Sequence, residues 1–278
     1  MRGFRRACGA LAAVSIGLLA AGRVAGEERE DNAALVEVIR EAATRQQQIA
    51  AQIADYTCTL VKRERVNGQL LEHEFIEVKL RQRQVREGRI VVPFSVYLRF
   101  LAPAEVRGRE VIYVEGRNDG KLIARRGGLR FAYVTTSVDP LGELAMERNR
   151  YPITHLGIQR LIEELLVVAQ EELGNPAEEL DVKQAGGAKI EGRPCRMIQV
   201  THSVRREQYR YYIARIFVDD QLELPIRFAS YDWPDTEGGQ PKLLEEYTYL
   251  NLKFNVGLTD WDFDHRNEEY QFLKDFQP

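Results

Sequence analysis

Apolar residues recur at helical spacing near the start of the chain and then change period. Between residues 32 and 54 they return every three or four positions, with Glu, Arg and Gln between them. This spacing predicts an amphipathic helix with one apolar stripe. Asp31 and Asn32 both suit the N-cap of that helix. From Tyr56 onward the pattern alternates, which is typical of β-strands.

Turn residues divide the alternating region into short strands. Asn67-Gly68 is a strong hairpin signal, and Arg86-Glu87-Gly88-Arg89 predicts a second hairpin. We expect the charged run Lys62-Arg63-Glu64-Arg65 beside the first turn to face solvent, as well as Arg81, Arg83 and Arg86 beside the second. Strands are predicted over residues 56–66, 69–80, 94–101, 110–114, 121–125, 129–135, 188–190, 195–203, 209–218, 225–231 and 244–254. Tight turns between close strands indicate an antiparallel meander.

A helical stretch interrupts the strands between Asp139 and Leu173. Its main helix, residues 156–173, is apolar over a wide arc and therefore needs cover. The predicted fold class is α+β, with a mostly antiparallel sheet of about ten to eleven strands, an N-terminal helix and this helical insertion. We expect a single domain over residues 27–278, because all-β folds often reach this length without dividing.

One predicted strand separates its apolar and polar side chains cleanly. Ser95, Tyr97 and Arg99 share one face, and the apolar side chains share the other. We interpret the apolar face as the lining of a cavity that the two helices plug or cover. A core filled by side chains is the alternative, because an aromatic stripe such as Tyr209 and Tyr211 occurs in both. The candidate cavity residues are Phe94, Val96, Leu98, Phe100, Leu161 and Leu165.

The first 26 residues have the composition of an export signal. Arg2, Arg5 and Arg6 precede an uncharged stretch from Ala7 to Gly22. A membrane helix needs about 20 apolar residues, so this stretch is too short to span a bilayer. We favour cleavage after Gly26, with Gly22 as the other candidate and an uncleaved anchor helix as the alternative. The mature chain is therefore expected in the periplasm or cell envelope, and not as an integral membrane protein.

Charge distribution limits the partners of the mature chain. The 278 residues include 39 Lys and Arg against 42 Asp and Glu, a net charge of −3. The four arginines of residues 1–26 have no acidic counterpart, which leaves 35 basic and 42 acidic residues and a net charge of −7. An acidic chain is a poor match for phosphate backbones, so a nucleic-acid partner is not expected.

Two cysteines, Cys58 and Cys195, remain after the export segment is removed. An exported protein encounters conditions that permit disulfides, so we predict that this pair is bridged. Two buried free thiols are the alternative, because an unpaired cysteine packs like a small apolar side chain.

No catalytic or metal-binding motif stands in the sequence. It contains no Gly-x-Ser-x-Gly, no Gly-x-x-x-x-Gly-Lys, no His-Glu-x-x-His and no Cys-x-x-Cys. The aspartates at 260, 262 and 264 resemble the start of a calcium loop, but His265 stands where that loop needs Gly, and Gln271 where it needs Glu. We therefore predict turn and helix-capping aspartates, no cofactor, and no enzymatic activity.

Several short motifs, in their order, resemble an exported bacterial family of unknown function. They are Asp55-Tyr56-Thr57-Cys58, Lys62-Arg63-Glu64-Arg65, Pro93-Phe94-Ser95-Val96-Tyr97, Gly108-Arg109-Glu110, Gly192-Arg193-Pro194-Cys195, Leu224-Pro225-Ile226, Glu246-Tyr247-Thr248-Tyr249, Asn255-Val256-Gly257-Leu258-Thr259 and Asp262-Phe263-Asp264. That family is similar in outline to the LolA-like superfamily, which includes periplasmic lipoprotein carriers. The resemblance implies an unclosed antiparallel barrel around helices, with an apolar cavity for acyl chains. Residues 81–92 depart from the pattern as an insertion before Pro93.

The sequence therefore leads to two functional hypotheses. The first is a non-catalytic periplasmic carrier of a lipid or lipoprotein acyl group. The alternative is an envelope protein-interaction or sensing module with a filled barrel. A continuous apolar cavity favours the carrier, whereas a packed interior favours the module.

Overall fold

The computed structural model describes residues 33–128 and 134–278. The segment interpreted as an export signal, residues 1–26, lies outside the described residues, as does most of the strand predicted over 129–135.

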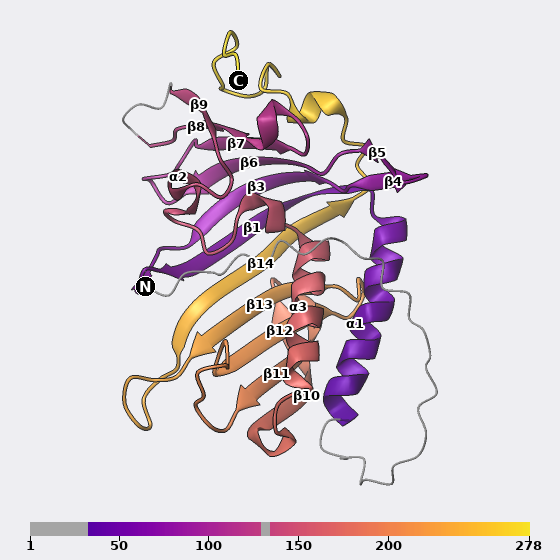
Figure 1. Cartoon of the computed structure of the whole chain (residues 1–278), viewed down its shortest axis with the longest axis vertical. Helices are drawn as coiled ribbons and strands as arrows, with labels where there is room; N and C mark the ends of the chain where they lie inside the picture. The colour runs from indigo at the N-terminus through magenta and orange to yellow at the C-terminus, as the bar shows by residue number, and fades with distance from the viewer. Residues whose placement is uncertain (1–32, 129–133) are drawn as a thin grey trace.

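A large antiparallel sheet of 12 strands dominates the described chain (Figure 1). Its order is β10-β11-β12-β13-β14-β1-β3-β6-β7-β8-β9, with the short β2 paired to β1. Within the described residues the end strands β9 and β10 do not pair with each other, so the sheet is unclosed. The bounds are β1 Asp55–Val66, β2 Gln69–Leu70, β3 Glu74–Arg81, β6 Ser95–Ala102, β7 Glu110–Val114, β8 Leu122–Arg125, β9 Thr135–Val138, β10 Leu180–Ile190, β11 Arg193–His202, β12 Ile213–Asp219, β13 Pro225–Asp232 and β14 Lys242–Phe254. The predicted class, an unclosed and mostly antiparallel fold with few helices, is confirmed.

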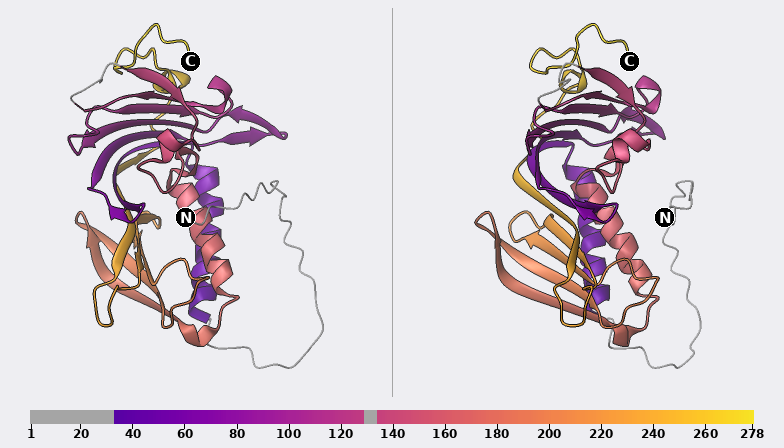
Figure 2. Two further views of the ribbon diagram at one scale, coloured as in Figure 1. Left: turned by 60° about the vertical axis from the view of Figure 1, so that its left-hand side comes forward. Right: turned by 90° about the vertical axis from the view of Figure 1, so that its left-hand side faces the viewer.

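Two long helices lie beside each other across the concave side of the curved sheet (Figure 2). They are α1 (Ala33–Gln52) and α3 (Ile158–Glu172), close to the predicted bounds of 32–54 and 156–173. The short helix α2 and the 3-10 turns occupy connections: α2 Glu143–Met146, η2 Asn118–Gly120, η3 Ile153–His155, η4 Ala177–Glu179 and η5 Asp260–Phe263.

Both predicted tight hairpins are present. Asn67 and Gly68 have positive φ angles of 50° and 82° between β1 and β2, as a two-residue primed turn requires. Glu87 and Gly88 have φ angles of 50° and 72° between β4 (Gln84–Arg86) and β5 (Arg89–Val92). The strands β4 and β5 pair only with each other within the described chain and form a separate two-stranded sheet.

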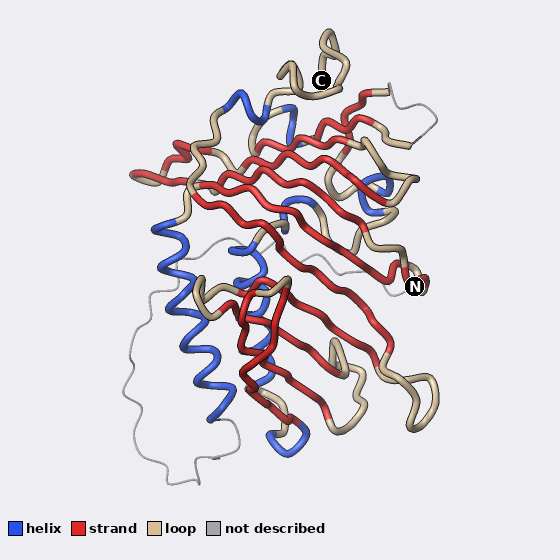
Figure 3. The backbone as a smooth tube through the Cα atoms, turned by 180° about the vertical axis from the view of Figure 1, so that it is seen from behind, coloured by secondary structure: helices blue, strands red, loops and turns tan. Residues whose placement is uncertain are grey.

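The large sheet has two halves, which meet where β1 pairs with β14 (Figure 3). We call β1, β3 and β6–β9 the N-terminal half, and β10–β14 the C-terminal half. The main hydrophobic cluster lies mostly on the concave side of the N-terminal half. On the convex side of that half, Tyr97, Ile112 and Ile123 pack against Phe263, Tyr270 and Phe272 of the C-terminal segment.

Three strand predictions were wrong. The strand predicted over residues 69–80 is divided into β2 and β3, because residues 71–73 are not in a strand. β10 runs from Leu180, not from Ala188, because Gly186 and Gly187 lie within a bulge that does not end the strand. β12 begins at Ile213, not at Tyr209, because Tyr209 and Tyr211 precede the strand and pack around His202.

Two expectations of solvent-facing charge were also wrong. Lys62 and Glu64 are buried, because β1 lies between β14 and β3 and its alternate side chains therefore face the concave side. Arg81 is buried too. Its guanidinium lies 2.7 Å from Asp260 and 5.0 Å from the centre of the Phe263 ring, since the C-terminal segment covers the convex side at this point.

Candidate functional site

The concave apolar face begins as a tightly packed core in the N-terminal half. Strand register places Leu80 beside Tyr56 on one side and Val96 on the other, and all three are almost completely buried. Ile158 and Ile162 of α3 belong to the same cluster. Here the helix fills the concavity instead of leaving a channel.

The start of α3 is fixed to this face by a close approach. The backbone N–H of Ile158 donates a hydrogen bond of 3.1 Å to the Tyr56 hydroxyl oxygen. Gly157, immediately before it, has a φ of 117°, and a Cβ at this position would lie 2.9 Å from a methyl carbon of Leu80. Only glycine fits both the angle and the space, so the helix meets the sheet here without intervening side chains.

The other long helix is linked to the C-terminal half by ion pairs. Arg196 of β11 donates to both carboxylate oxygens of Glu41 on α1, at 2.6 and 2.9 Å. Arg45 of α1 pairs with Glu223 in the connection between β12 and β13. All four side chains remain partly exposed to solvent. Exposed pairs of this kind contribute about 0.2–1 kcal/mol each, so they are weak fastenings.

Packing on the concave side of the C-terminal half is incomplete. Val200, Tyr211 and Ala214 are buried there. The apolar side chains around them, from α3 and from the sheet, are only partly buried: Val168, Leu180, Val182, Phe228 and Leu244. Each of these five side chains therefore keeps part of its surface accessible to solvent.

Where the halves meet, the concave face carries buried charges. The Lys62 ammonium lies 3.1 Å from Glu74 and 3.3 Å from Glu64. Arg150, from the helical insertion, pairs with Glu245 at 2.9 Å, and its backbone N–H donates to Glu64 at 3.1 Å. We call Lys62, Glu64, Glu74, Arg150 and Glu245 the junction cluster.

Hydroxyl groups complete the junction cluster. Ser230 donates to Glu245 at 2.9 Å, Tyr151 donates to the same carboxylate at 3.2 Å, and Tyr247 donates to Glu64. Burial and the neighbouring carboxylates of Glu245 and Glu64 raise the pKa of Tyr247 well above its usual value. The tyrosine therefore stays protonated and remains a donor. The network attaches the insertion to the sheet.

A second polar group closes the far end of the concave face. His202 is fully buried, with its Nε2 3.1 Å from a carboxylate oxygen of Glu172, the last residue of α3. Its ring stacks on Tyr209 with centroids 3.8 Å apart. Burial opposes ionisation of Glu172, but hydrogen bonds from His202, Asn175 and Tyr211 lower its pKa overall. This contact holds the end of α3 against β11.

The structure separates the predicted cavity residues into two groups. The strand residues Phe94, Val96, Leu98 and Phe100 share the concave side, as predicted, and are buried in the main cluster. Leu161 and Leu165 lie on α3 and are partly buried, with Leu161 packed against the same cluster. Sequence reasoning missed the junction cluster. Its signal was the alternation that places Lys62 and Glu64 on the same face as Leu60.

The predicted disulfide is not formed. Cys58 and Cys195 are both free and buried, and they belong to different hydrophobic clusters. Cys58 lies on β1 and Cys195 on β11, four strand spacings apart. At the usual spacing of about 4.8 Å between neighbouring strands, four spacings span about 19 Å along the sheet, whereas a disulfide joins Cα atoms less than about 7 Å apart. Burial raises the pKa of Cys58, so the thiol is unreactive.

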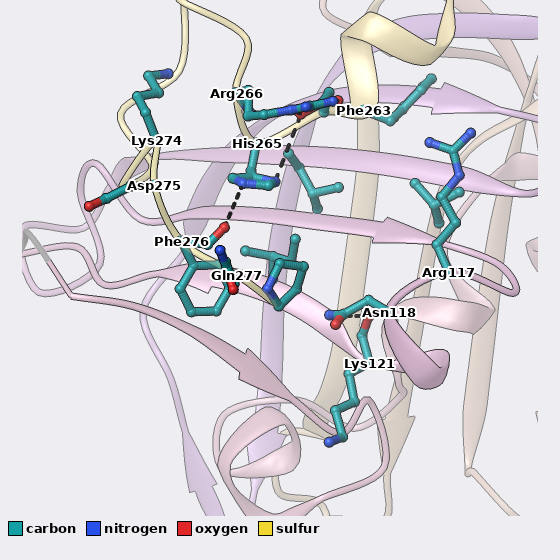
Figure 4. A pocket seen from close by; sticks show the side chains of 15 residues that line it. Arg117, Asn118, Lys121, Phe263, His265, Arg266, Lys274, Asp275, Phe276 and Gln277 are labelled. Atoms are coloured by element: carbon teal, nitrogen blue, oxygen red, sulfur yellow. Dashed lines mark hydrogen bonds and ion pairs between the residues drawn. The ribbon is translucent and has the colours of Figure 1, made fainter.

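A separate pocket of about 570 Å³ lies on the convex side, between β7, β8 and the C-terminal segment (Figure 4). Its floor is apolar and its rim is mainly basic. Arg117 pairs with Asp260, Arg266 pairs with Asp264, and the Lys274 ammonium donates to two backbone carbonyl groups. Because these cations serve internal contacts, we take the concave side as the candidate functional site.

Neither metal chemistry nor a membrane-spanning helix is indicated by the described residues. No group of three or more His, Cys, Asp or Glu side chains in them could hold a metal ion. Of the aspartates that resemble a calcium loop, Asp262 forms a capping box with Thr259, whereas Asp260 and Asp264 pair with arginines. Among the described helices, none combines the length and apolarity needed to cross a bilayer.

Comparisons with known proteins identify a family and several weak structural similarities. A family model described as "Protein of unknown function (DUF1571)" matches residues 53–272. No curated protein matches the chain. A crystal structure of a DUF1329 family protein from Desulfovibrio piger is 16% identical, with a TM-score of 0.38, covering 83% of this chain and 97% of that one.

Two further crystal structures have similar scores. A domain assigned to outer membrane lipoprotein sorting, from Vibrio parahaemolyticus, is 11% identical with a TM-score of 0.38, covering 81% of this chain and 96% of its own. A LolA superfamily protein from Nitrosomonas europaea is 10% identical with a TM-score of 0.32, covering 83% and 97%. At these scores the superpositions carry no functional argument.

Proposed function

The chain belongs to the DUF1571 family, and we propose that it is a non-catalytic binding protein of the cell envelope that carries a lipid or lipoprotein acyl group. The observation that carries the proposal is the incomplete packing on the concave side of the C-terminal half. There, apolar side chains of α3 and of the sheet, among them Val168 and Phe228, remain partly exposed. Near the start of the sequence, three arginines precede an uncharged apolar stretch, and this pattern supports a location outside the cytoplasm.

The energies favour entry of an acyl chain beneath α1. Each buried methylene is worth about 0.8 kcal/mol, so a chain of about fifteen methylenes carries about 12 kcal/mol of transfer free energy. The ion pairs Glu41–Arg196 and Arg45–Glu223 contribute at most about 1 kcal/mol each. Moving α1 also exposes its buried Leu35 and Ile49, at a cost of about 1.5–3 kcal/mol each, so the entering acyl chain has to replace these apolar contacts as well. In this arrangement Leu161 and Leu165 of α3 belong to the cover, and Phe94, Val96, Leu98 and Phe100 form the closed end.

Locking α1 to the sheet tests the proposal. The double variant Glu41→Cys/Arg196→Cys is joined by a bismaleimide that spans the two side chains, and binding of a fluorescent fatty acid is measured before and after joining. We expect binding by the unjoined protein and at least a tenfold loss after joining. The matched control is Glu77→Cys/Arg99→Cys, which replaces an exposed pair on the convex side and should bind equally well in both states.

Mass spectrometry of the protein extracted under native conditions from its own envelope identifies the ligand. A bound lipid or acylated peptide is the expected result. If no lipid is found and the unjoined double variant does not bind the probe, the carrier proposal is wrong.

A packed interior supports a second candidate function, an envelope protein-interaction or sensing module. Its favouring observation is the fully packed concave side of the N-terminal half, where Leu60, Leu80 and Val96 are inaccessible to solvent. Such a module does not bind the fatty acid, with or without the link between α1 and β11. The link also leaves the surface available to a partner unchanged.

A further inference from the structure

The hairpin of β4 and β5 is an unusual surface element. It projects from one end of the large sheet (Figures 1 and 2) and pairs with no other strand within the described residues. Three of its apolar side chains are about half exposed: Val85 at 55%, Ile90 at 51% and Val91 at 49%. An isolated hairpin with exposed β-branched residues has no core to stabilise it.

Its charge is opposite to that of the rest of the chain. Residues 81–92 contain four arginines and one glutamate, whereas the whole chain has a net charge of −3. Arg81 and Arg83 serve the base of the hairpin, where they pair with Asp260 and Glu115. Arg86 and Arg89 are exposed at the tip.

Strand register divides the hairpin into an apolar and a cationic face. Val85 lies directly opposite Ile90, and Arg86 directly opposite Arg89. Because side chains alternate along a strand, these two pairs point to opposite faces. Like charges placed opposite each other repel and destabilise a hairpin. A negatively charged surface next to Arg86 and Arg89 offsets this repulsion.

We propose that this hairpin docks the protein on an anionic lipid surface. Val85, Ile90 and Val91 enter the interfacial region, and Arg86 and Arg89 reach the anionic headgroups, as the long side chains of amphipathic membrane-surface elements do. The docking is peripheral and reversible, and it does not depend on whether the concave side binds an acyl chain.

Charge complementarity distinguishes the hairpin from another exposed apolar site. Leu141 and Leu144, near α2, are more exposed, at 72% and 67%. Their neighbours Asp139 and Glu143 are acidic, so an anionic membrane repels that site. The site near α2 has the more exposed apolar side chains, but only the hairpin has the positive charge that an anionic lipid surface attracts.

Vesicle flotation tests the proposal with the full mature chain. The vesicles contain either phosphatidylcholine alone or equal parts of phosphatidylglycerol and phosphatidylcholine. We expect binding to the anionic vesicles only, and weaker binding as salt increases. Arg86→Gln and Arg89→Gln should each weaken binding about fivefold. Val85→Ser/Ile90→Ser should weaken it at least tenfold at constant charge.

The controls separate docking from folding and from ligand binding. Leu141→Ser/Leu144→Ser removes a comparable apolar area and should leave vesicle binding unchanged. All variants should retain the melting temperature of the parent protein, because the altered side chains are exposed, and should retain fatty-acid binding if the parent has it. Equal binding to both vesicle types overturns the proposal, as does unchanged binding of the hairpin variants. Loss of a self-associated form in those variants, without loss of vesicle binding, would also overturn it.

Discussion

The two halves of the sheet use the same antiparallel pattern with different results. The N-terminal half is covered on both faces, by α1, α3 and the insertion on the concave side and by the C-terminal segment on the convex side. The C-terminal half is covered on its concave side only in part. Sealing both faces of a sheet gives a fixed core, and leaving one interface loosely packed gives a surface that can accept another molecule.

The largest effect is expected where the two halves meet. Glu64→Ala removes the carboxylate that contacts Lys62, Tyr247 and the backbone of Arg150. Removing one partner of a buried ion pair leaves its charge uncompensated, so the free energy of unfolding should fall by about 3–5 kcal/mol. Urea denaturation measures this. The exposed carboxylate of Glu77 is the control, and Glu77→Ala should cost at most about 1 kcal/mol. Similar losses for the two variants would contradict a buried junction cluster.

Matched leucine truncations compare the packing of the halves directly. Leu80 is fully buried in the N-terminal half, and Leu244 is partly buried in the C-terminal half. Leu80→Ala should lower the free energy of unfolding by about 3–4 kcal/mol, and Leu244→Ala by only about 1–2 kcal/mol, because a partly open site leaves a smaller new cavity. Denaturant titration of both variants gives the two values. Equal losses would show that both halves are equally packed.

The smallest effect is a local response to acid at the end of the C-terminal half. The hydrogen bonds from Arg206 and Tyr209 lower the pKa of Glu179 from 4.5 to about 2. A lowered carboxyl pKa stabilises the fold above the unfolded-state value, and this stabilisation is lost as the pH falls from about 4.5 toward 2. The protection of amide hydrogens over residues 203–212 against exchange, relative to the intrinsic exchange rate at each pH, should therefore fall in that interval. Arg206→Ala should shift this loss of protection to higher pH, and an unchanged profile would exclude this contact as its cause.

Local periodicity was sufficient for most of the elements. Both long helices lie within about two residues of their predicted bounds, and the Asn67-Gly68 and Glu87-Gly88 turns are where the alternation placed them. The shared face of Phe94, Val96, Leu98 and Phe100 was also predicted correctly. The errors at β10 and β12 arose where glycine or aromatic residues obscured the strand end.

The candidate site was less predictable than the elements that form it. Nothing near Lys62 in the sequence indicates that it meets Glu74 and the insertion residue Asn149. The charged run resembled a solvated hairpin end because its burial depends on the distant strand β14 pairing along β1, with Tyr247 opposite Lys62. The disulfide prediction failed for the same reason, since compartment chemistry permits a bridge and only strand order decides whether two thiols meet.

The sequence by itself determined the identity of the elements, the turns between them and the side chains that share a face, because these follow from periods of 3.6 and 2 within a short segment. The tertiary structure alone decided which face became concave, which charges were buried and which apolar surface stayed partly open. Those outcomes depend on the order in which distant strands pair and on what covers each face, and a one-residue change of register would reverse them.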